Sequence, residues 1–78
     1  MQHALYKDIG IRIAKLRKEQ KLTQLQLSEA LDISVKHMSE TERGIVCLSL
    51  EKLVLLCDIL STNMDYLIRG IESDVSVE

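Results

Sequence analysis

The stretch that decides the fold runs from Leu22 to Met38 and reads LTQLQLSEALDISVKHM. It holds two short apolar patterns with helical spacing. A hydroxyl side chain precedes each pattern, Thr23 the first and Ser34 the second, and both residue types are favoured as helix N-caps. Only Leu31-Asp32-Ile33-Ser34 separates the two patterns, so we predict two helices joined by a tight turn.

The same start signal occurs three times along the chain. Thr23 followed by Gln26 forms a capping box, and Ser34 and Ser49 are the second and third caps. At each cap an apolar residue precedes the hydroxyl and another follows four positions later, as in a hydrophobic staple. The repeats predict helix starts at 23–24, 34–35 and 49–50.

The rest of the chain also has a helical pattern. We predict a first helix from Tyr6 to about Gln20, an end of the third helix at Gly44 and a fourth helix over 50–60. A last short helix would be capped by Asn63 and would stop at Gly70. No strand signal competes, because the alternation in 75–77 is too short. We therefore expect one all-α domain, 1–78, a compact bundle of five short helices with its core over about 6–70 and polar, frayed or partner-dependent ends (1–5 and 71–78).

Size and composition limit the functions that the chain can have. A chain of 78 residues has little room for a deep catalytic cleft, and we find no nucleophile–base pair, phosphate loop or paired carboxylates, so we expect no enzyme and no cofactor. No apolar run reaches the roughly 18 residues that cross a bilayer, which predicts a cytoplasmic protein without a membrane partner. Cys47 and Cys57 are too few for a disulfide scaffold. Because His3 and His37 lack further ligands at suitable spacing, we expect no metal.

Charge is unevenly distributed along the chain. The net charge is −2, but residues 1–21 carry six basic and two acidic residues, whereas residues 49–78 carry two basic and six acidic ones. A basic first third suggests that one end of the domain faces a polyanion. Solvated, purely solubilising faces are the alternative. The scarcity of aromatic residues (3%) argues against single-strand and RNA modules, which stack bases on aromatic rings.

The third helix has two different faces. At about 100° per residue, Met38, Thr41, Glu42 and Ile45 fall on one side, which we expect to face inward, and Lys36, Glu40 and Arg43 fall on the other. An α-helix fits the DNA major groove, and its N-terminal residues meet base edges. The candidate base-reading residues are therefore Ser34, Val35, Lys36, His37 and Glu40. The alternative is that Lys36 and Glu40 form a solvated pair.

From Ile9 to Gly70 the chain resembles the lambda-repressor and Cro type of helix-turn-helix domain, also called the Xre family. The residues that carry the likeness include Leu22-Thr23-Gln24, Leu27-Ser28-Glu29-Ala30-Leu31, Glu42-Arg43-Gly44, Ser49-Leu50-Glu51 and Asp65-Tyr66-Leu67-Ile68. The resemblance implies a recognition helix in the major groove, over about 34–44, and a dimeric, repressor-like transcriptional regulator. Asp32 stands where the family usually has glycine, and aspartate tolerates the left-handed conformation of that turn.

The resemblance also implies roles for residues outside the third helix. Gln24 matches a family glutamine that contacts the DNA backbone, and a helix N-terminus favours a phosphate. Arg17 and Glu42 match a partly buried ion pair. The expected phosphate contacts are Gln24, Thr23, Arg43 and Ser39, with Arg12, Lys15 and Lys18 as weaker candidates. After Gly44 the sequence departs from the family, because Ile45-Val46-Cys47-Leu48 lacks the usual basic residue and proline.

The fourth helix is apolar almost all round. Its expected core stripe is Leu50, Leu53, Val54, Leu56, Cys57 and Leu60. The remaining apolar residues Leu55 and Ile59 lie where the family is usually polar, so with Tyr66 they predict a homodimer interface. The alternative is that the tail covers them through Ile71 or Val75. A symmetric dimer predicts a pseudo-palindromic double-stranded operator. The rival function is a protein-interaction module of the same fold, such as an antitoxin or antirepressor.

Overall fold

The computed structural model describes residues 2–71, and all of the regular secondary structure in that range is helical. Its elements are α1 (Gln2–Glu19), α2 (Gln24–Leu31), α3 (Val35–Glu42), α4 (Leu50–Leu60) and a single π-helical turn, η1 (Asp65–Arg69). The predicted all-α bundle of five short helices is confirmed. None of the helices in this range is long and apolar enough to cross a bilayer.

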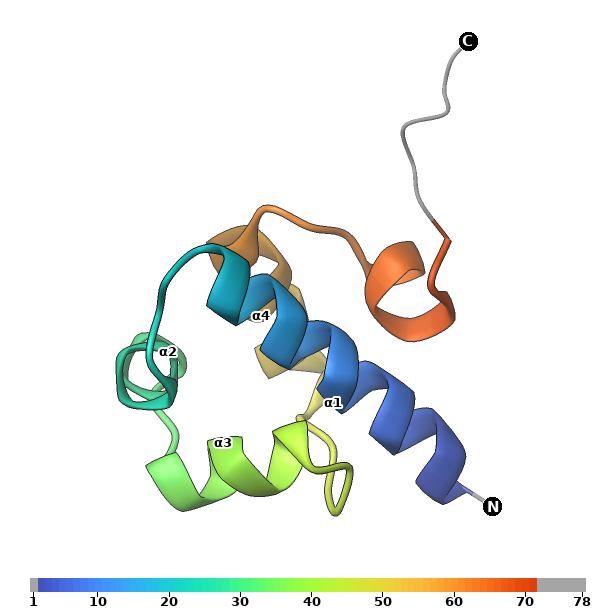
Figure 1. Cartoon of the computed structure of the whole chain (residues 1–78), viewed down its shortest axis with the longest axis horizontal. Coiled ribbons are helices and arrows are strands. Elements are labelled where there is room, and N and C mark those ends of the chain that lie inside the picture. The colour runs from blue at the N-terminus through green and yellow to red at the C-terminus, as the bar shows by residue number, and fades with distance from the viewer. Residues whose placement is uncertain (1, 72–78) are drawn as a thin grey trace, which may run out of the picture.

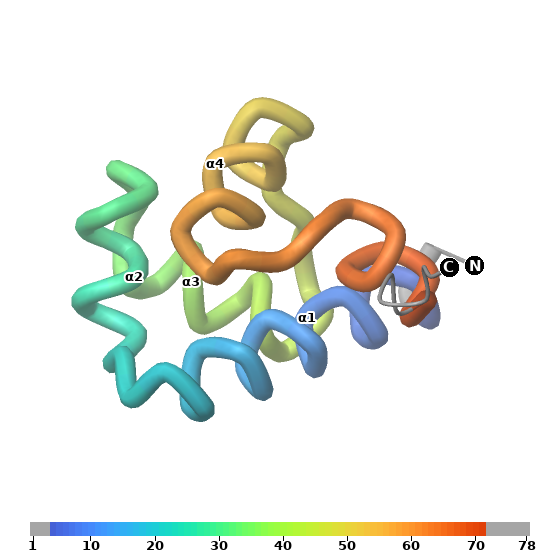
Figure 2. The backbone as a smooth tube through the Cα atoms, turned by 90° about the horizontal axis from the view of Figure 1, so that it is seen from above, coloured from blue at the N-terminus to red at the C-terminus, as the bar shows by residue number. Residues whose placement is uncertain are grey.

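The long helix α1 organises the bundle. In Figure 1 it crosses the molecule diagonally, with α4 behind it and α3 below it, while α2 is seen end-on. The view from above shows α2 and η1 at opposite ends of α1 (Figure 2). The pair α2 and α3 therefore forms one side of the molecule, away from η1.

All three predicted caps are formed. The Thr23 hydroxyl accepts a hydrogen bond from the Gln26 amide at 3.0 Å, and the Gln26 side chain accepts one from the Thr23 amide at 2.9 Å. The Ser34 hydroxyl accepts from the amide of His37, and the Ser49 hydroxyl accepts from that of Lys52. These bonds satisfy amides that the first turn of a helix leaves without a partner, which fixes the starts of α2, α3 and α4.

Left-handed residues end the helices where the sequence predicts. Asp32 (φ 59°), Gly44 (φ 80°) and Gly70 (φ 74°) all have positive φ. At Asp32 the chain leaves α2, and the next amide, of Ile33, donates back to the Ser28 carbonyl at 2.9 Å. This is the hydrogen bond of a Schellman ending. The predicted turn between α2 and α3 is thus formed, and Asp32 adopts in it the left-handed backbone conformation that glycine usually adopts. Asn63 caps the last element, because its side-chain oxygen accepts from the Tyr66 amide at 2.9 Å.

The core takes side chains from every element. Its buried apolar residues are Ile9, Ile13, Leu27, Leu31, Met38, Leu48, Leu53, Leu56, Cys57, Leu60 and Leu67. Gly10 allows α1 to approach α3 closely, because a Cβ at this position would lie 2.6 Å from the carbonyl oxygen of Glu42 and closer still to that of Thr41. A larger residue at position 10 would push α3 away from α1.

The predicted start of α1 is wrong. The helix begins at Gln2 rather than Tyr6, so residues 2–5, which we expected to be frayed, are helical. Beyond this added turn, Lys7 lies against the segment that follows α3. A Cβ on Gly44 would be 2.6 Å from the Lys7 Cα. The added first turn has no capping signal in the sequence. Residues 72–78, and with them Val75, lie outside the described residues.

Three apolar residues assigned to the interior are exposed. Ile45 is 53% exposed because α3 ends at Glu42, so the helical periodicity that placed Ile45 inward no longer applies. Leu50 (69%) and Val54 (49%) are exposed because α4 buries a narrower face, formed by Leu53, Leu56, Cys57 and Leu60.

Long polar side chains connect the helices by donating to carbonyls at helix ends. Lys52 Nζ donates to the Leu31 carbonyl at the end of α2 (2.7 Å), and Gln20 Nε2 donates to the Leu60 carbonyl at the end of α4 (2.7 Å). Such carbonyls have no partner within their own helix. These contacts join α4 to α2 and the end of α1 to α4.

Candidate nucleic-acid interface

The N-terminal half of α3 is on the surface of the molecule. Ser34, Val35 and Lys36 are exposed, and His37 and Glu40 are half-buried. On the opposite side of the helix Met38 and Thr41 are buried at 0% and 1% exposure. The helix is therefore held by one face, and the face with the predicted base-reading residues stays accessible within residues 2–71.

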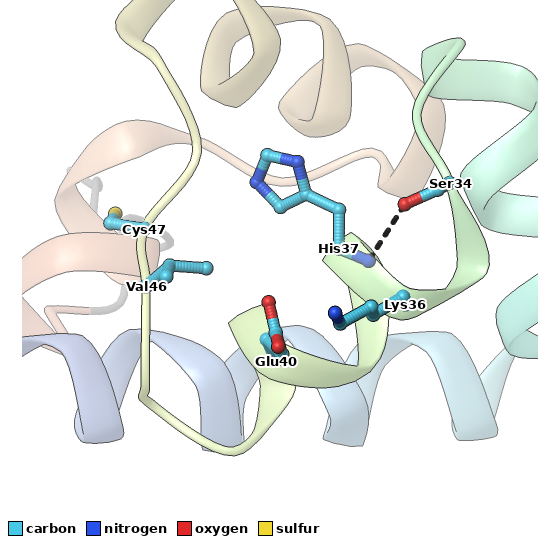
Figure 3. A pocket seen from close by; sticks show the side chains of 6 residues that line it. All are labelled: Ser34, Lys36, His37, Glu40, Val46 and Cys47. Carbon is cyan, nitrogen blue, oxygen red and sulfur yellow. Dashed lines mark hydrogen bonds between the residues drawn. The ribbon is translucent and has the colours of Figure 1, made fainter.

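A groove of about 370 Å³ runs between α3 and the segment that follows it. Four of the predicted base-reading residues line it, Ser34, Lys36, His37 and Glu40, whereas Val35 does not. Figure 3 shows the side chains of Lys36, His37 and Glu40 directed into the space between the helix and that segment. The structure thus brings four of the five residues into one concave surface.

Sequence reasoning missed the other wall of this groove. Val46 and Cys47 complete the lining, and Figure 3 shows the Val46 side chain directed toward Glu40 and His37. In the sequence, the segment after Gly44 is marked only by its lack of basic residues and proline. The available signal was the left-handed glycine, which reverses the chain so that the following residues return alongside α3.

Lys36 and Glu40 do not pair with each other. Within the described part of the chain, the ion pair is that of Arg17 with Glu42. The alternative prediction, a solvated ion pair between Lys36 and Glu40, is therefore wrong. Both charged groups remain available to a ligand in the groove.

Arg17 and Glu42 join α1 to the end of α3 behind the exposed face. Arg17 Nε donates to Glu42 Oε2 at 2.6 Å, and Arg17 Nη2 donates to Oε1 at 3.0 Å. The two side chains are only 10% and 7% exposed. The hydrogen bond to Glu42 raises the pKa of the Arg17 guanidinium, against the opposing effect of burial. The pair matches the one that the family resemblance implied.

Gln24 belongs to the same network. Its amide nitrogen donates to Glu42 Oε1 at 2.9 Å, which orients the side chain at the first position of α2. The side-chain amide of glutamine has two N–H donors and one carbonyl acceptor, so this bond leaves a second N–H for another partner. The sequence placed Gln24 at a helix N-terminus but did not indicate its bond to the ion pair.

The other predicted phosphate contacts surround α3 and the start of α2. Thr23 and Arg43 are exposed, and Ser39 is half-buried. Arg43 Nε donates to the Ser39 carbonyl at 3.4 Å, so the guanidinium folds back along the end of α3. Arg12, one of the weaker candidates, is engaged elsewhere. Its Nη1 donates to the carbonyls of Leu67 and Ile68, both at 3.1 Å, so its role is to hold η1.

The predicted dimer residues differ in exposure. Leu55 is 39% exposed, whereas Ile59 is half-buried against the core and Tyr66 is half-buried. Ile71, which the alternative placed over them, is itself 45% exposed.

Of the two thiols, that of Cys57 is buried and that of Cys47 is half-buried. Burial raises the pKa of both Cys47 and Cys57, which disfavours the reactive thiolate. Cys57 is 7% exposed and its Sγ lies 3.6 Å from the Met64 sulfur. Among the described residues no group of three or more His, Cys, Asp or Glu side chains could hold a metal ion.

Comparisons with known proteins agree with this architecture. Residues 13–67 match a family model described as helix-turn-helix. An uncharacterised HTH-type transcriptional regulator of Rickettsia conorii is 34% identical over 64 residues, which cover 82% of this chain and 51% of the relative. The chain therefore spans about half the length of the curated relatives it matches.

Two solved structures have a similar fold. The clp gene regulator ClgR of Corynebacterium glutamicum is 28% identical with a TM-score of 0.76, over 82% of this chain and 82% of that one. The restriction-modification controller protein C.AhdI of Aeromonas hydrophila is 25% identical with a TM-score of 0.75, over 82% of this chain and 97% of that one. From the family match and the shared architecture, this chain belongs to the helix-turn-helix family, in its lambda-repressor and Xre type.

Proposed function

We propose that this protein binds double-stranded DNA in a sequence-specific manner through the N-terminal half of α3, and that it acts as a repressor-like transcriptional regulator. The observation that carries the proposal is the exposed face of α3, with Ser34 and Lys36 at its start and Glu40 one turn later. A helix anchored by Met38 and Thr41 can enter the roughly 12 Å wide major groove without disturbing the core.

Each base-reading residue has a partner of matching chemistry. Lys36 can donate to guanine O6 and N7, and Val35 can pack on a thymine methyl. Glu40 can accept from cytosine N4, and Ser34 and His37 can hydrogen-bond to a base edge. Glu40 chiefly rejects wrong sequences, because a carboxylate inside a polyanion is unfavourable unless it faces a donor.

The phosphate contacts would fix the register on DNA. At the start of α2, free backbone amides and the second N–H of Gln24 can meet one phosphate beside Thr23. Arg43 and Ser39 would contact phosphates at the other end of the proposed interface. Because Glu42 holds Gln24, the ion pair with Arg17 would orient a DNA contact as well as join two helices.

We further propose that the protein acts as a homodimer through α4 and η1, with Leu55, Ile59 and Tyr66 at the interface. The support is the apolar surface that Leu55 leaves uncovered. Twofold symmetry would pair two recognition helices with half-sites about 34–36 Å apart, or a multiple of that, on a pseudo-palindromic operator.

A second candidate function is protein binding through the same face. The surface near the starts of α2 and α3 exposes Leu25 (53%) and Val35 (40%), and the protein is acidic overall. Apolar side chains of this kind favour a protein partner over a polyanion, so an antitoxin or antirepressor remains the rival proposal.

Salt dependence separates the two functions. Duplexes are selected from a random pool with the purified protein, and the affinity for the best one is measured against ionic strength. Neutralising Z phosphates makes log K fall with log[salt] at a slope of about −0.9Z. A steep fall supports DNA binding. Failure to retain any duplex at low salt would refute it and favour the protein partner.

A further inference from the structure

The groove beside α3 has one polar and one apolar wall. Glu40 and His37 belong to the helix, and Val46 faces them from the segment after Gly44 (Figure 3). Val46 is half-buried, so its branched side chain is fixed in place yet open on one side to a ligand. In the same view the Cys47 thiol points away from the other labelled side chains, which leaves Val46 as the apolar contact.

One base edge matches both walls at once. In the major groove cytosine presents its N4 amino group as a donor, and the neighbouring ring atom, C5, carries either hydrogen or a methyl group. A carboxylate that accepts from N4 therefore has C5 directly beside it. An apolar side chain next to that carboxylate contacts the C5 substituent.

We infer that the groove between α3 and Val46 binds the N4–C5 edge of a cytosine and favours 5-methylcytosine over the unmodified base. The inference rests on the proposed function, because it assigns the base that Glu40 reads. Val46 thereby becomes a further specificity-determining residue.

The other pyrimidine does not suit the site. Thymine also has a C5 methyl group, but it presents O4, an acceptor, where cytosine presents a donor. Two acceptors facing each other repel, and Lys36, which lines the same groove, forms no ion pair with Glu40 that would relieve that repulsion. A half-buried carboxylate that loses water without gaining a donor is strongly disfavoured. The polar wall thus selects cytosine, and the apolar wall adds preference for its methyl group.

The experiment uses the duplex that the protein selects from a random pool. Each cytosine is replaced in turn by 5-methylcytosine, and affinities are measured by fluorescence anisotropy at fixed salt. Burying one methyl-sized group is worth about 0.8 kcal/mol, or a gain of about fourfold in affinity. We expect that gain at one cytosine of each half-site, and replacement of that cytosine by thymine should weaken binding.

Two variants test the assignment to Val46. Val46→Ser should lose the gain from methylation, so that the ratio of its affinities for the methylated and unmodified duplexes falls from about fourfold to about one. The matched control is Ile45→Ser, which removes the adjacent apolar side chain, exposed by 53% and outside the groove lining, and should keep the full gain. If Val46→Ser unfolds in a thermal melt, Val46→Ala takes its place with the same expectation.

The possible failures are distinguishable. If no duplex is retained, the proposed function itself is wrong. If a duplex binds but no cytosine methylation tightens binding, or if the Val46 variants keep the gain, the methyl-reading groove is wrong while DNA binding stands. A selected site without cytosine also overturns the inference.

Discussion

Arg17 on α1 and Glu42 at the end of α3 form a bidentate ion pair, with Nε–Oε2 and Nη2–Oε1 distances of 2.6 and 3.0 Å. Arg17 Nη1 also donates to the Leu22 carbonyl, and Glu42 accepts from Gln24. The pair therefore joins the first helix, the start of the second and the end of the third. Both side chains are mostly buried, so each depends on the other for compensation of its charge.

Arg17→Ala should lower the free energy of unfolding by about 3–5 kcal/mol, because it leaves the Glu42 charge buried and unpaired. Urea unfolding monitored by circular dichroism measures the change. Arg43→Ala, which removes an exposed guanidinium from the same region, serves as the control and should cost little. A loss below about 1 kcal/mol for Arg17→Ala would contradict a structural role for the pair.

Gly10→Ala should destabilise the protein although alanine is the better helix former by about 1 kcal/mol. The added methyl would meet the carbonyl oxygens of Thr41 and Glu42, which cannot move without shifting α3. We expect a net loss of about 1–3 kcal/mol, as for overpacked cores, measured by urea unfolding. Asp8→Ala on the exposed side of α1 is the control. A stabilised Gly10→Ala would mean that α1 and α3 are not in close contact.

Arg12→Met should weaken the attachment of η1 and leave the DNA interface intact. The guanidinium donates to the carbonyls of Leu67 and Ile68, and hydrogen bonds from a charged group contribute about 1.5–3 kcal/mol. We expect a loss of stability in that range. The slope of log K against log[salt] for DNA binding should be the same as in the wild type, because the substitution removes no phosphate contact. If log K falls less steeply with log[salt] in the variant than in the wild type, Arg12 does contact a phosphate.

Lys36→Ala should reduce affinity for the selected duplex by about 1–3 kcal/mol and relax the base preference at one position. The reason is that Lys36 is exposed at the start of α3, where base edges are met. Repeating the selection with the variant reveals the lost position. Arg69→Ala removes an equal charge from η1 and should leave the preference unchanged. An unchanged base preference in Lys36→Ala would mean that Lys36 does not read a base.

Leu55→Glu should convert the proposed dimer to a monomer, because it places a charge in an apolar interface. Sedimentation equilibrium at about 100 µM measures the mass at a defined protomer concentration. Leu50→Glu is the control, since Leu50 is more exposed but lies on the other flank of α4. A monomeric wild type refutes the dimer. If only Leu50→Glu produces a monomer, the dimer interface lies on the flank of α4 that contains Leu50.

Local signals in the sequence predicted the helix starts and ends well. Thr23, Ser34 and Ser49 cap as expected, because a capping hydroxyl contacts an amide only a few residues away. Asp32 and Gly44 end their helices for an equally local reason, the left-handed backbone that they tolerate. The exposed face of α3 followed from helical periodicity alone.

Contacts between distant residues account for the errors. The exposure of Leu50 and Val54 depends on how much of α4 its neighbours cover. The bonds of Arg12 to η1 were likewise hidden from the sequence, because their partners lie 55 and 56 residues away. Periodicity assigns a side chain to a face of a helix but does not say whether anything covers that face.

The amino-acid order alone determined the helices, their caps and turns, and the accessible face of the third helix, because each of these depends on residues within about one or two turns of one another. Only the tertiary structure decided that Gln24 is held by Glu42 and that Val46 forms a wall opposite Glu40. Both relationships arise where separate segments are brought side by side by burial of a common core, and burial depends on the whole chain rather than on local sequence.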